Sequence, residues 1–379
     1  MKFPPFSFPK EHGTRYALVF ALDAGQGSFS TAAVEYSHKN KPKILASSNG
    51  ESLPSEIGSE LGPKTLEELG KVIKNLSDSF PGRSLPRRQS RAVCVLGAPF
   101  YTAKTSVIKF RSKEPVLVTE ALINSMVSSG VKPALNDKPL VIAKKILGVL
   151  INGYPSNSPV GKKGTAVEVH YFESVASEVL VKKISKAVEP LINSSLSFEP
   201  ASLSAFISLR DEFKAPDDFL MLLPGKKITE VSLIRDSLLR STVSFPMGTE
   251  DIQYGTKSKS KEISRSLKIL KERGHESKVN LPDKTDTVIS DWVKSFNASL
   301  AELEEGGPLP PVFYILDSFG ADIYLSLFKA PGRYGLRLPL GVSLRLLGLK
   351  ELQGTFDSGS SSFPDPAALL AALYVQHTF

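Results

Sequence analysis

The sequence predicts an α/β protein built from two related halves, each organised around a mixed sheet. Two stretches, ALDAGQGSFSTAAVE from Ala21 and LMLLPGKKITEVSLIRDSLL from Leu220, share one pattern: an apolar run, a tight turn containing glycine, and a second apolar run of alternating polarity. This pattern is typical of a β-hairpin whose turn can approach a ligand closely. The chain of 379 residues is long enough for two or more domains, and its 41% hydrophobic content fits a soluble globular protein.

Periodicity places the elements of the first half. The expected elements are strands at 16–23, 28–36, 43–48 and 92–96, with a helix at 64–78 between the last two. A block that looks inserted follows from 104 to 167, with a polar strand, a helix near 119–129 and strands around 141–151. A second helix is expected at 174–192, with one apolar face made by Val175, Val179, Leu180 and Ile184.

The second half opens with the helical segment ASLSAFISLRDEF and continues with the hairpin from Leu220. A strongly basic segment at 251–274 reads as helical, and a strand is expected at 312–316. The segment 354–362 is rich in Gly and Ser and reads as a flexible linker. The helix at 367–374 is apolar nearly all round, so we expect it to pack in the fold as the closing element.

A further motif lies in INGYPSNSPVGKKGTAVEVHYFES, residues 151–174. Pro159, Gly161 and Gly164 precede an alternating strand at 167–172. In its order of motifs, most of the chain resembles the FtsA and PilM group of the bacterial actin-like ATPases. The resemblance implies an actin-like ATPase fold, with two ribonuclease-H-like halves containing mixed sheets and a small inserted subdomain.

The resemblance also implies how the chain divides. The expected divisions are a flexible arm at 1–16, the start of the first half at 17–103, an inserted FtsA-type subdomain at 104–167, the return helix of the first half at 168–192, the second half at 193–353, and a linker with the closing helix at 354–379. The prolines of the arm disfavour regular helix or central strand.

The first hairpin carries residues that suit a nucleotide. Asp23 lies at the turn and is followed by Gly25, Gly27 and Ser28, so a carboxylate and backbone N–H groups are available to a phosphate and its metal. In the family, each half presents such a hairpin to a nucleotide held between the halves. The resemblance therefore implies ATP and magnesium as cofactors, with Asp23 as the metal ligand. A carboxylate that only caps its own turn would give the same sequence.

The second hairpin has lost this chemistry. Leu223 stands where the family has a carboxylate for the metal and the attacking water, and Pro224 removes a backbone donor. Gly225 follows, and then Lys226 and Lys227. These two lysines either meet phosphate oxygens as point charges or form a solvated hairpin tip.

Other contact points of the family are altered as well. In the basic helix, Glu262 and Lys268 are the candidates for the nucleoside contacts. Glu230 replaces the family's later acid, although an exposed strand residue would look the same. Phe319 stands beside Gly320 where the family has a Gly-Gly pair, and its side chain would crowd the base. Loss of one positioned electrostatic group costs about 10²–10³-fold in rate, so we expect negligible hydrolysis and weak or absent nucleotide binding.

Composition excludes several classes of function. The formal net charge is +8, but the charges are dispersed and the short basic runs lack stacking aromatics, so no nucleic-acid partner is expected. The single cysteine, Cys94, lies in an apolar run and should be buried. No window of ~18 consecutive apolar residues occurs and the N-terminal stretch does not resemble a signal peptide, so we expect a cytoplasmic protein.

Two classes of function remain open from the sequence. One is a cytoplasmic scaffold that resembles FtsA and recruits partner proteins at the inner membrane face in cell division. The other is an active actin-like ATPase whose nucleotide cycle controls polymerisation. Loss of the contact residues favours the scaffold, a degenerate ATPase with no enzymatic role.

The expected partners follow from the same resemblance. FtsA ends in a basic amphipathic membrane helix, whereas the closing helix here has no Lys or Arg. A PilM-like role in type IV pilus assembly, with membrane contact only through a partner, is therefore the alternative. The expected partners are proteins of the division or pilus machinery, and self-association stays open.

Overall fold

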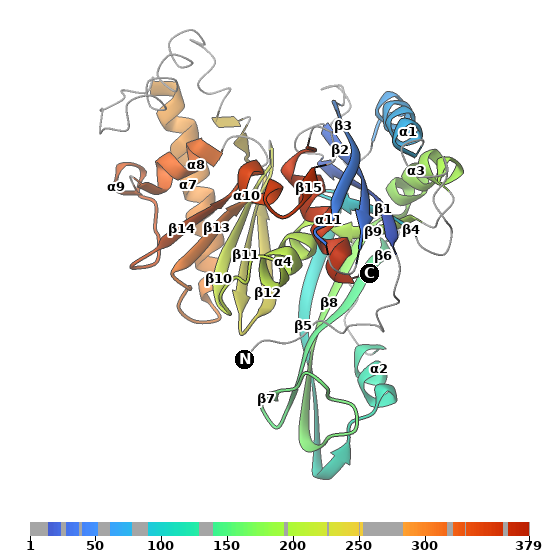
Figure 1. The fold of residues 1–379 in the computed structure, drawn as a ribbon. Coiled ribbons are helices and arrows are strands. Elements are labelled where there is room, and N and C mark those ends of the chain that lie inside the picture. The colour runs from blue at the N-terminus through green and yellow to red at the C-terminus, as the bar shows by residue number, and fades with distance from the viewer. Residues whose placement is uncertain are drawn as a thin grey trace.

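The computed structural model describes residues 14–23, 28–37, 40–51, 61–77, 90–128, 139–192, 196–225, 227–249, 251–252, 283–316, 321–329, 331–358 and 363–378. Over these residues the chain forms a six-stranded, a five-stranded and a four-stranded sheet with helices packed between and around them (Figure 1). The α/β class predicted from the sequence is confirmed.

The first sheet has the strand order β15-β3-β2-β1-β4-β9. Its central strand β1 is antiparallel to β2 and parallel to β4. The inner strands are apolar on both faces, so each face must be covered by other elements. The strands are β1 (Arg15–Asp23), β2 (Ser28–Tyr36), β3 (Lys43–Glu51), β4 (Ser90–Leu96), β9 (Leu196–Pro200) and β15 (Asp357–Ser358).

The second sheet repeats this arrangement in the order β12-β11-β10-β13-β14. Its central strand β10 is antiparallel to β11 and parallel to β13, as β1 is to β2 and β4. The strands are β10 (Phe219–Pro224), β11 (Thr229–Arg235), β12 (Leu238–Phe245), β13 (Val312–Leu316) and β14 (Ser343–Leu347). Both predicted hairpins are present, and they occupy the same place in their sheets.

The third sheet has the order β5-β8-β6-β7 and extends away from the first sheet (Figure 1). Its strands are β5 (Tyr101–Leu117), β6 (Pro139–Ile151), β7 (Tyr154–Pro155) and β8 (Lys163–Ser177). Helix α2 (Glu120–Ser128) covers one face, where Ile123 and Met126 join an apolar cluster with Val167 and Val169. This sheet falls where the sequence predicts the inserted block, and the domain boundaries themselves stay a prediction.

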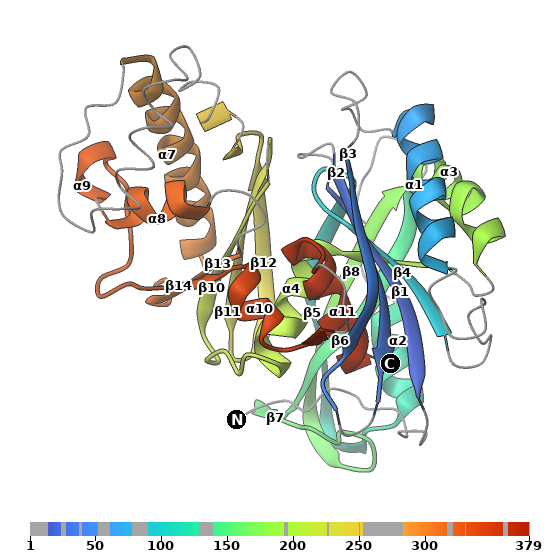
Figure 2. The same cartoon turned by 45° about the horizontal axis from the view of Figure 1, so that its top comes forward.

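Helices separate and cover the first two sheets in alternating layers (Figure 2). Helices α1 (Pro63–Ser77) and α3 (Glu178–Val188) cover the outer face of the first sheet, and α3 continues into a 3₁₀ turn at Glu189–Leu191. Helices α4 (Ala201–Asp211) and α11 (Pro366–Thr378) lie between the two sheets. On the outer side of the second sheet lie α7 (Asp283–Glu304), α8 (Ala321–Lys329) and α9 (Pro331–Tyr334); α10 (Leu349–Gln353) precedes β15.

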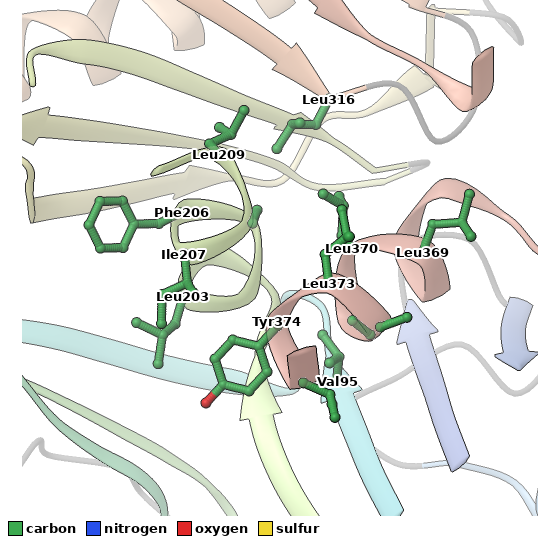
Figure 3. Close-up of a cluster of buried hydrophobic side chains, with 14 of the residues drawn as sticks. Val95, Leu203, Phe206, Ile207, Leu209, Leu316, Leu369, Leu370, Leu373 and Tyr374 are labelled. Atoms are coloured by element: carbon green, nitrogen blue, oxygen red, sulfur yellow. The ribbon is translucent and has the colours of Figure 1, made fainter. Parts of the chain in front are cut away.

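The middle layer joins the two halves through one continuous apolar cluster. It contains Val19 and Val95 from the first sheet, Met221 and Leu316 from the second, and the inward side chains of α4 and α11 (Figure 3). The hydroxyls of Ser204 and Ser208 in α4 also lie within hydrogen-bond distance of the Leu370 carbonyl in α11, at 3.4 and 3.1 Å.

The start of the second predicted helix is wrong. Residues 174–177 continue β8, where they pair with β5 on one side and β6 on the other. Val175 is therefore a buried strand residue, and Val179, at 49% exposed, does not belong to the buried helix face. Leu180 and Ile184 are buried in α3 as expected.

Predictions near the C-terminal end of the sequence are confirmed in one part and wrong in another. Helix α11 packs in the core, as expected of a closing element. The predicted linker at 354–362 is not wholly irregular, because Asp357–Ser358 pairs in parallel with β3 and Phe356 is buried. The prediction for Cys94 is confirmed, since it is fully buried in β4.

Two expected features fall on residues that the structure does not describe. Most of the arm at 1–16 lies outside the described residues, although Arg15 and Tyr16 already belong to β1. The basic helix expected at 251–274 lies outside them from residue 253 onward. Within the described part of the chain, none of the helices has the length and apolar character needed to cross a bilayer.

Candidate functional site

The first hairpin brings the ends of its two strands together. Asp23 ends β1 and lies opposite Ser28, the first residue of β2, as a hairpin of this length requires. Gly25 and Gly27, in the turn, lie outside the described residues, as do the side chains of Asp23 and Ser28. The ligand role predicted for this turn therefore stays a prediction.

The second hairpin is closed by its own backbone. The Gly225 N–H donates to the Ile228 carbonyl at 2.9 Å, and the Gly225 carbonyl accepts from the Thr249 N–H at 2.9 Å. Both main-chain groups of Gly225 are thus engaged within the protein, and the preceding Pro224 has no N–H to offer. A phosphate at this turn would have to displace existing hydrogen bonds.

Of the remaining predicted site residues, the structure describes only Lys227, in the turn of this hairpin. Lys227 is exposed, which fits the solvated-tip alternative. Lys226, Glu262, Lys268 and Gly320 lie outside the described residues.

Between the two hairpins lies a cavity of about 70 Å³. It is lined mostly by apolar side chains, and Leu223 is one of them. Leu223 lies directly opposite Glu230 in the β10–β11 register, so the position where the family has a carboxylate faces the cavity with a hydrocarbon side chain. The lining residues are Ala21, Leu22, Val95, Gly97, Ala98, Ala201, Ser204, Leu223, Pro224, Gly225, Ile228, Glu230, Ala367 and Leu370.

The described residues around this cavity do not fit ATP with its metal. Ligand pockets of small molecules are typically about 300–1,000 Å³, several times the volume found here. A triphosphate also needs cations and free N–H donors, whereas the described lining contains no Lys or Arg and the Gly225 N–H is already bonded. Among the described residues there is no group of three His, Cys, Asp or Glu side chains that could hold a metal.

Among the described residues of the cavity lining, Glu230 is the one carboxylate, and it is buried, with 6% of its surface exposed. The interpretation of Glu230 as an exposed strand residue is therefore wrong. Its Oε1 accepts a hydrogen bond from the Tyr101 hydroxyl at 2.6 Å. This length is typical of a hydroxyl that donates to an ionised carboxylate.

Tyr101 completes a three-residue cluster with Ser202. The Tyr101 oxygen lies 2.8 Å from Ser202 Oγ and accepts the Ser202 backbone N–H at 3.3 Å. Because the single Tyr101 proton is used by Glu230, the Ser202 hydroxyl donates to the Tyr101 oxygen. Burial raises the pKa of Tyr101 well above its usual value, and the Glu230 charge raises it further, so Tyr101 stays a neutral donor.

Sequence reasoning missed Tyr101 and Ser202 entirely. Tyr101 begins β5, Ser202 lies in the first turn of α4 and Glu230 lies in β11. The Tyr101–Glu230 contact spans 129 positions along the chain. No local pattern in the sequence signals such a contact.

The two hairpin-bearing sheets and the helices shared between them form the actin-like ATPase fold, as the sequence predicts. Among solved structures, the chain is similar to one titled "PilM-PilN type IV pilus biogenesis complex", with a TM-score of 0.62 and 13% identity over 98% of this chain and 100% of that one. At this identity the similarity establishes the fold alone.

Two further solved structures match less well. A Bacteroides thetaiotaomicron VPI-5482 protein with actin-like ATPase fold has a TM-score of 0.39 and 10% identity, over 88% of this chain and 91% of that chain. The ethanolamine utilization protein EutJ from Carboxydothermus hydrogenoformans has a TM-score of 0.43 and 10% identity, over 98% and 92%. No protein-family model matches the sequence, and no curated protein matches it.

Proposed function

We propose that the protein is an actin-like scaffold that recruits partner proteins at the inner face of the membrane, with little or no ATP hydrolysis. The observation that carries this proposal is the second hairpin, where Leu223 faces an apolar cavity and the Gly225 N–H is already bonded. Phosphoryl transfer depends on positioned charges and a metal, and this hairpin has Leu223 at the position expected to carry the metal carboxylate. A fold that keeps its core without this chemistry remains usable as a binding body.

Hydrolysis is tested directly by a phosphate-release assay on the purified chain with ATP and Mg²⁺, run beside calorimetric titration of the same components. We expect phosphate release at the level of the buffer blank and no resolved heat of binding. A hydrolysing actin-like protein in the same buffer serves as the positive control. Turnover that is abolished by Asp23→Ala would overturn the proposal and would identify Asp23 as the metal ligand.

We place the scaffold in type IV pilus assembly ahead of cell division. The support is the similarity in fold to a PilM chain determined together with PilN, which matches that chain over its full length. The partner proposed for this chain is accordingly a membrane-anchored pilus-assembly protein, through which the scaffold reaches the membrane.

Deletion of the gene separates the two roles. For a pilus role we expect loss of surface pili, scored by electron microscopy, with cells of normal length. Filamentous cells that retain their pili would replace the pilus role with the division role predicted from the resemblance to FtsA. Complementation with the wild-type gene controls for effects on neighbouring genes.

A further inference from the structure

We propose that this chain joins its two halves without a nucleotide, through the Tyr101–Ser202–Glu230 cluster set on the helix pair α4–α11. This inference rests on the proposed weak or absent nucleotide binding. It goes beyond that proposal by naming the side chains that connect the two halves.

The three residues of the cluster come from three different parts of the fold. Tyr101 belongs to the sheet that extends from the first half, Glu230 belongs to the second sheet, and Ser202 belongs to the helix between them. The hydrogen bonds at 2.6 and 2.8 Å therefore cross the boundary between the halves. Only the closed arrangement of the halves brings these donors and acceptors together.

Because all three residues of the cluster are buried, their hydrogen bonds should contribute strongly to the contact between the two halves. Tyr101 is 8% exposed, Glu230 is 6% exposed and Ser202 is fully buried. Hydrogen bonds are stronger in such a low-dielectric environment, and a buried carboxylate that loses its donor is costly. Glu230 thus favours the state in which Tyr101 is within reach.

The helix pair beneath the cluster makes the same connection with apolar contacts. Ser202 is the second residue of α4. Leu203 and Phe206 of the same helix belong to the apolar cluster that also contains Leu373 and Tyr374 of α11 (Figure 3). The Ser208 hydroxyl also donates to the Leu370 carbonyl of α11 at 3.1 Å. The Tyr101–Ser202–Glu230 cluster is therefore attached to the layer of helices between the first and second sheets.

The cavity beside the cluster explains why a nucleotide is not needed as a bridge. Leu223, Ile228 and Leu370 bring side chains from both halves to the same small space. Mostly apolar side chains from both halves therefore line the space between the two hairpins. The arrangement of the two halves is then stabilised by the hydrophobic effect and by the buried Tyr101–Ser202–Glu230 cluster.

The test compares Tyr101→Phe with Tyr154→Phe, which removes the same atom from a side chain that is 77% exposed. Thermal unfolding of the wild type and both variants is followed with and without ATP and Mg²⁺. We expect Tyr101→Phe to lower Tm by roughly 1–4 °C and Tyr154→Phe to leave it unchanged. ATP and Mg²⁺ should not shift Tm of the wild type.

Hydrogen exchange separates a bridge between the halves from simple packing. In Tyr101→Phe, we expect exchange about tenfold faster in peptides on both sides of the cleft, 94–97 and 220–230, with α2 unchanged. Glu230→Gln provides a second variant should Tyr101→Phe not fold. It keeps an acceptor but removes the charge, and we expect a smaller change of the same sign.

The outcomes distinguish the two proposals. If Tyr101→Phe and Glu230→Gln both leave Tm and exchange at the cleft unchanged, the bridge is overturned while the scaffold function stands. If ATP and Mg²⁺ raise Tm of the wild type by several degrees, the nucleotide-free bridge is overturned, whereas the scaffold function falls only if phosphate is also released.

Discussion

At the scale of single residues, His170 forms a second polar contact between the halves. Its Nδ1 lies 2.9 Å from Nη1 of Arg240 in β12, and because Arg240 can only donate, Nδ1 is the acceptor. His170 is 2% exposed, and its Nε2 has no hydrogen-bond partner among the described residues. Burial first, and then the Arg240 charge, lower the pKa of His170 to about 4, against smaller raising effects of Glu168 and Asp236.

This lowered pKa predicts a loss of stability in mild acid. The folded protein holds His170 neutral down to pH about 4, whereas the unfolded chain protonates it near pH 6.5, so the unfolded state gains the proton first. The stabilisation is present above pH 6.5 and declines as the pH falls towards 4, by up to about 3 kcal/mol from this residue. Urea unfolding at pH 7 and pH 4.5 measures the decline.

The control for this prediction is His170→Gln, which offers Arg240 an acceptor that does not titrate. We expect the free energy of unfolding of the variant to depend less on pH than that of the wild type over the same interval. Equal pH dependence in the two proteins would show that His170 does not titrate in the way its surroundings indicate.

At the scale of elements, α11 packs against both α4 and the first sheet. Tyr36 of β2 donates a buried hydrogen bond to the Ala372 carbonyl at 2.9 Å, which fixes the helix against that sheet. Leu373, the next residue of α11, is fully buried.

Truncation of Leu373 tests this role. We expect Leu373→Ala to lower the free energy of unfolding by about 2–5 kcal/mol, because it leaves a cavity between layers that cannot easily collapse. Leu340→Ala is the matched control, since Leu340 is 98% exposed and its truncation should change stability by less than about 0.5 kcal/mol. Chemical unfolding of both variants measures the difference, and similar losses would contradict the assigned place of α11.

Elements with a clear period were predictable from the sequence, and their ends were not. The hairpin strands and α1 agree closely with their predicted ranges, because alternation and helical spacing are local properties. The boundary between β8 and α3 was misplaced, since the apolar residues around Val175 suit both structures. These residues form a strand because they pair with β5 on one side and with β6 on the other, which the local sequence does not reveal.

The candidate site was predictable only where it depends on residue type. The loss of the carboxylate at Leu223 and of the N–H at Pro224 is visible in the sequence. The use of the Gly225 N–H within its own turn, and the contact of Tyr101 with Glu230, depend on tertiary structure and were missed.

At the scale of the whole molecule, one apolar cluster runs through both sheets and the helices between them. Halves that share a core should unfold together rather than one after the other. The chain provides a unique probe in each half, since it has one tryptophan and one cysteine. Trp292 is buried behind the second sheet and Cys94 is buried in the first.

We expect the two probes to report the same transition. Trp292 fluorescence and Cys94 thiol labelling, followed across a urea series, should give coincident midpoints. Cys94→Ala with the fluorescence assay repeated controls for perturbation by the label. A tryptophan transition that precedes labelling by a clear margin would show that the halves unfold independently.

The path of the chain has a consequence for its synthesis. Helix α11 and the short strand β15 belong to the first half by their contacts, yet both follow the entire second half in the sequence. While the ribosome makes residues 219–347, α11 has not yet been synthesised. The face of the first sheet that α11 covers is therefore still exposed to water. The nascent first half therefore keeps this apolar surface exposed until α11 has emerged from the ribosome. Chaperones that bind apolar surface should associate with it during that interval.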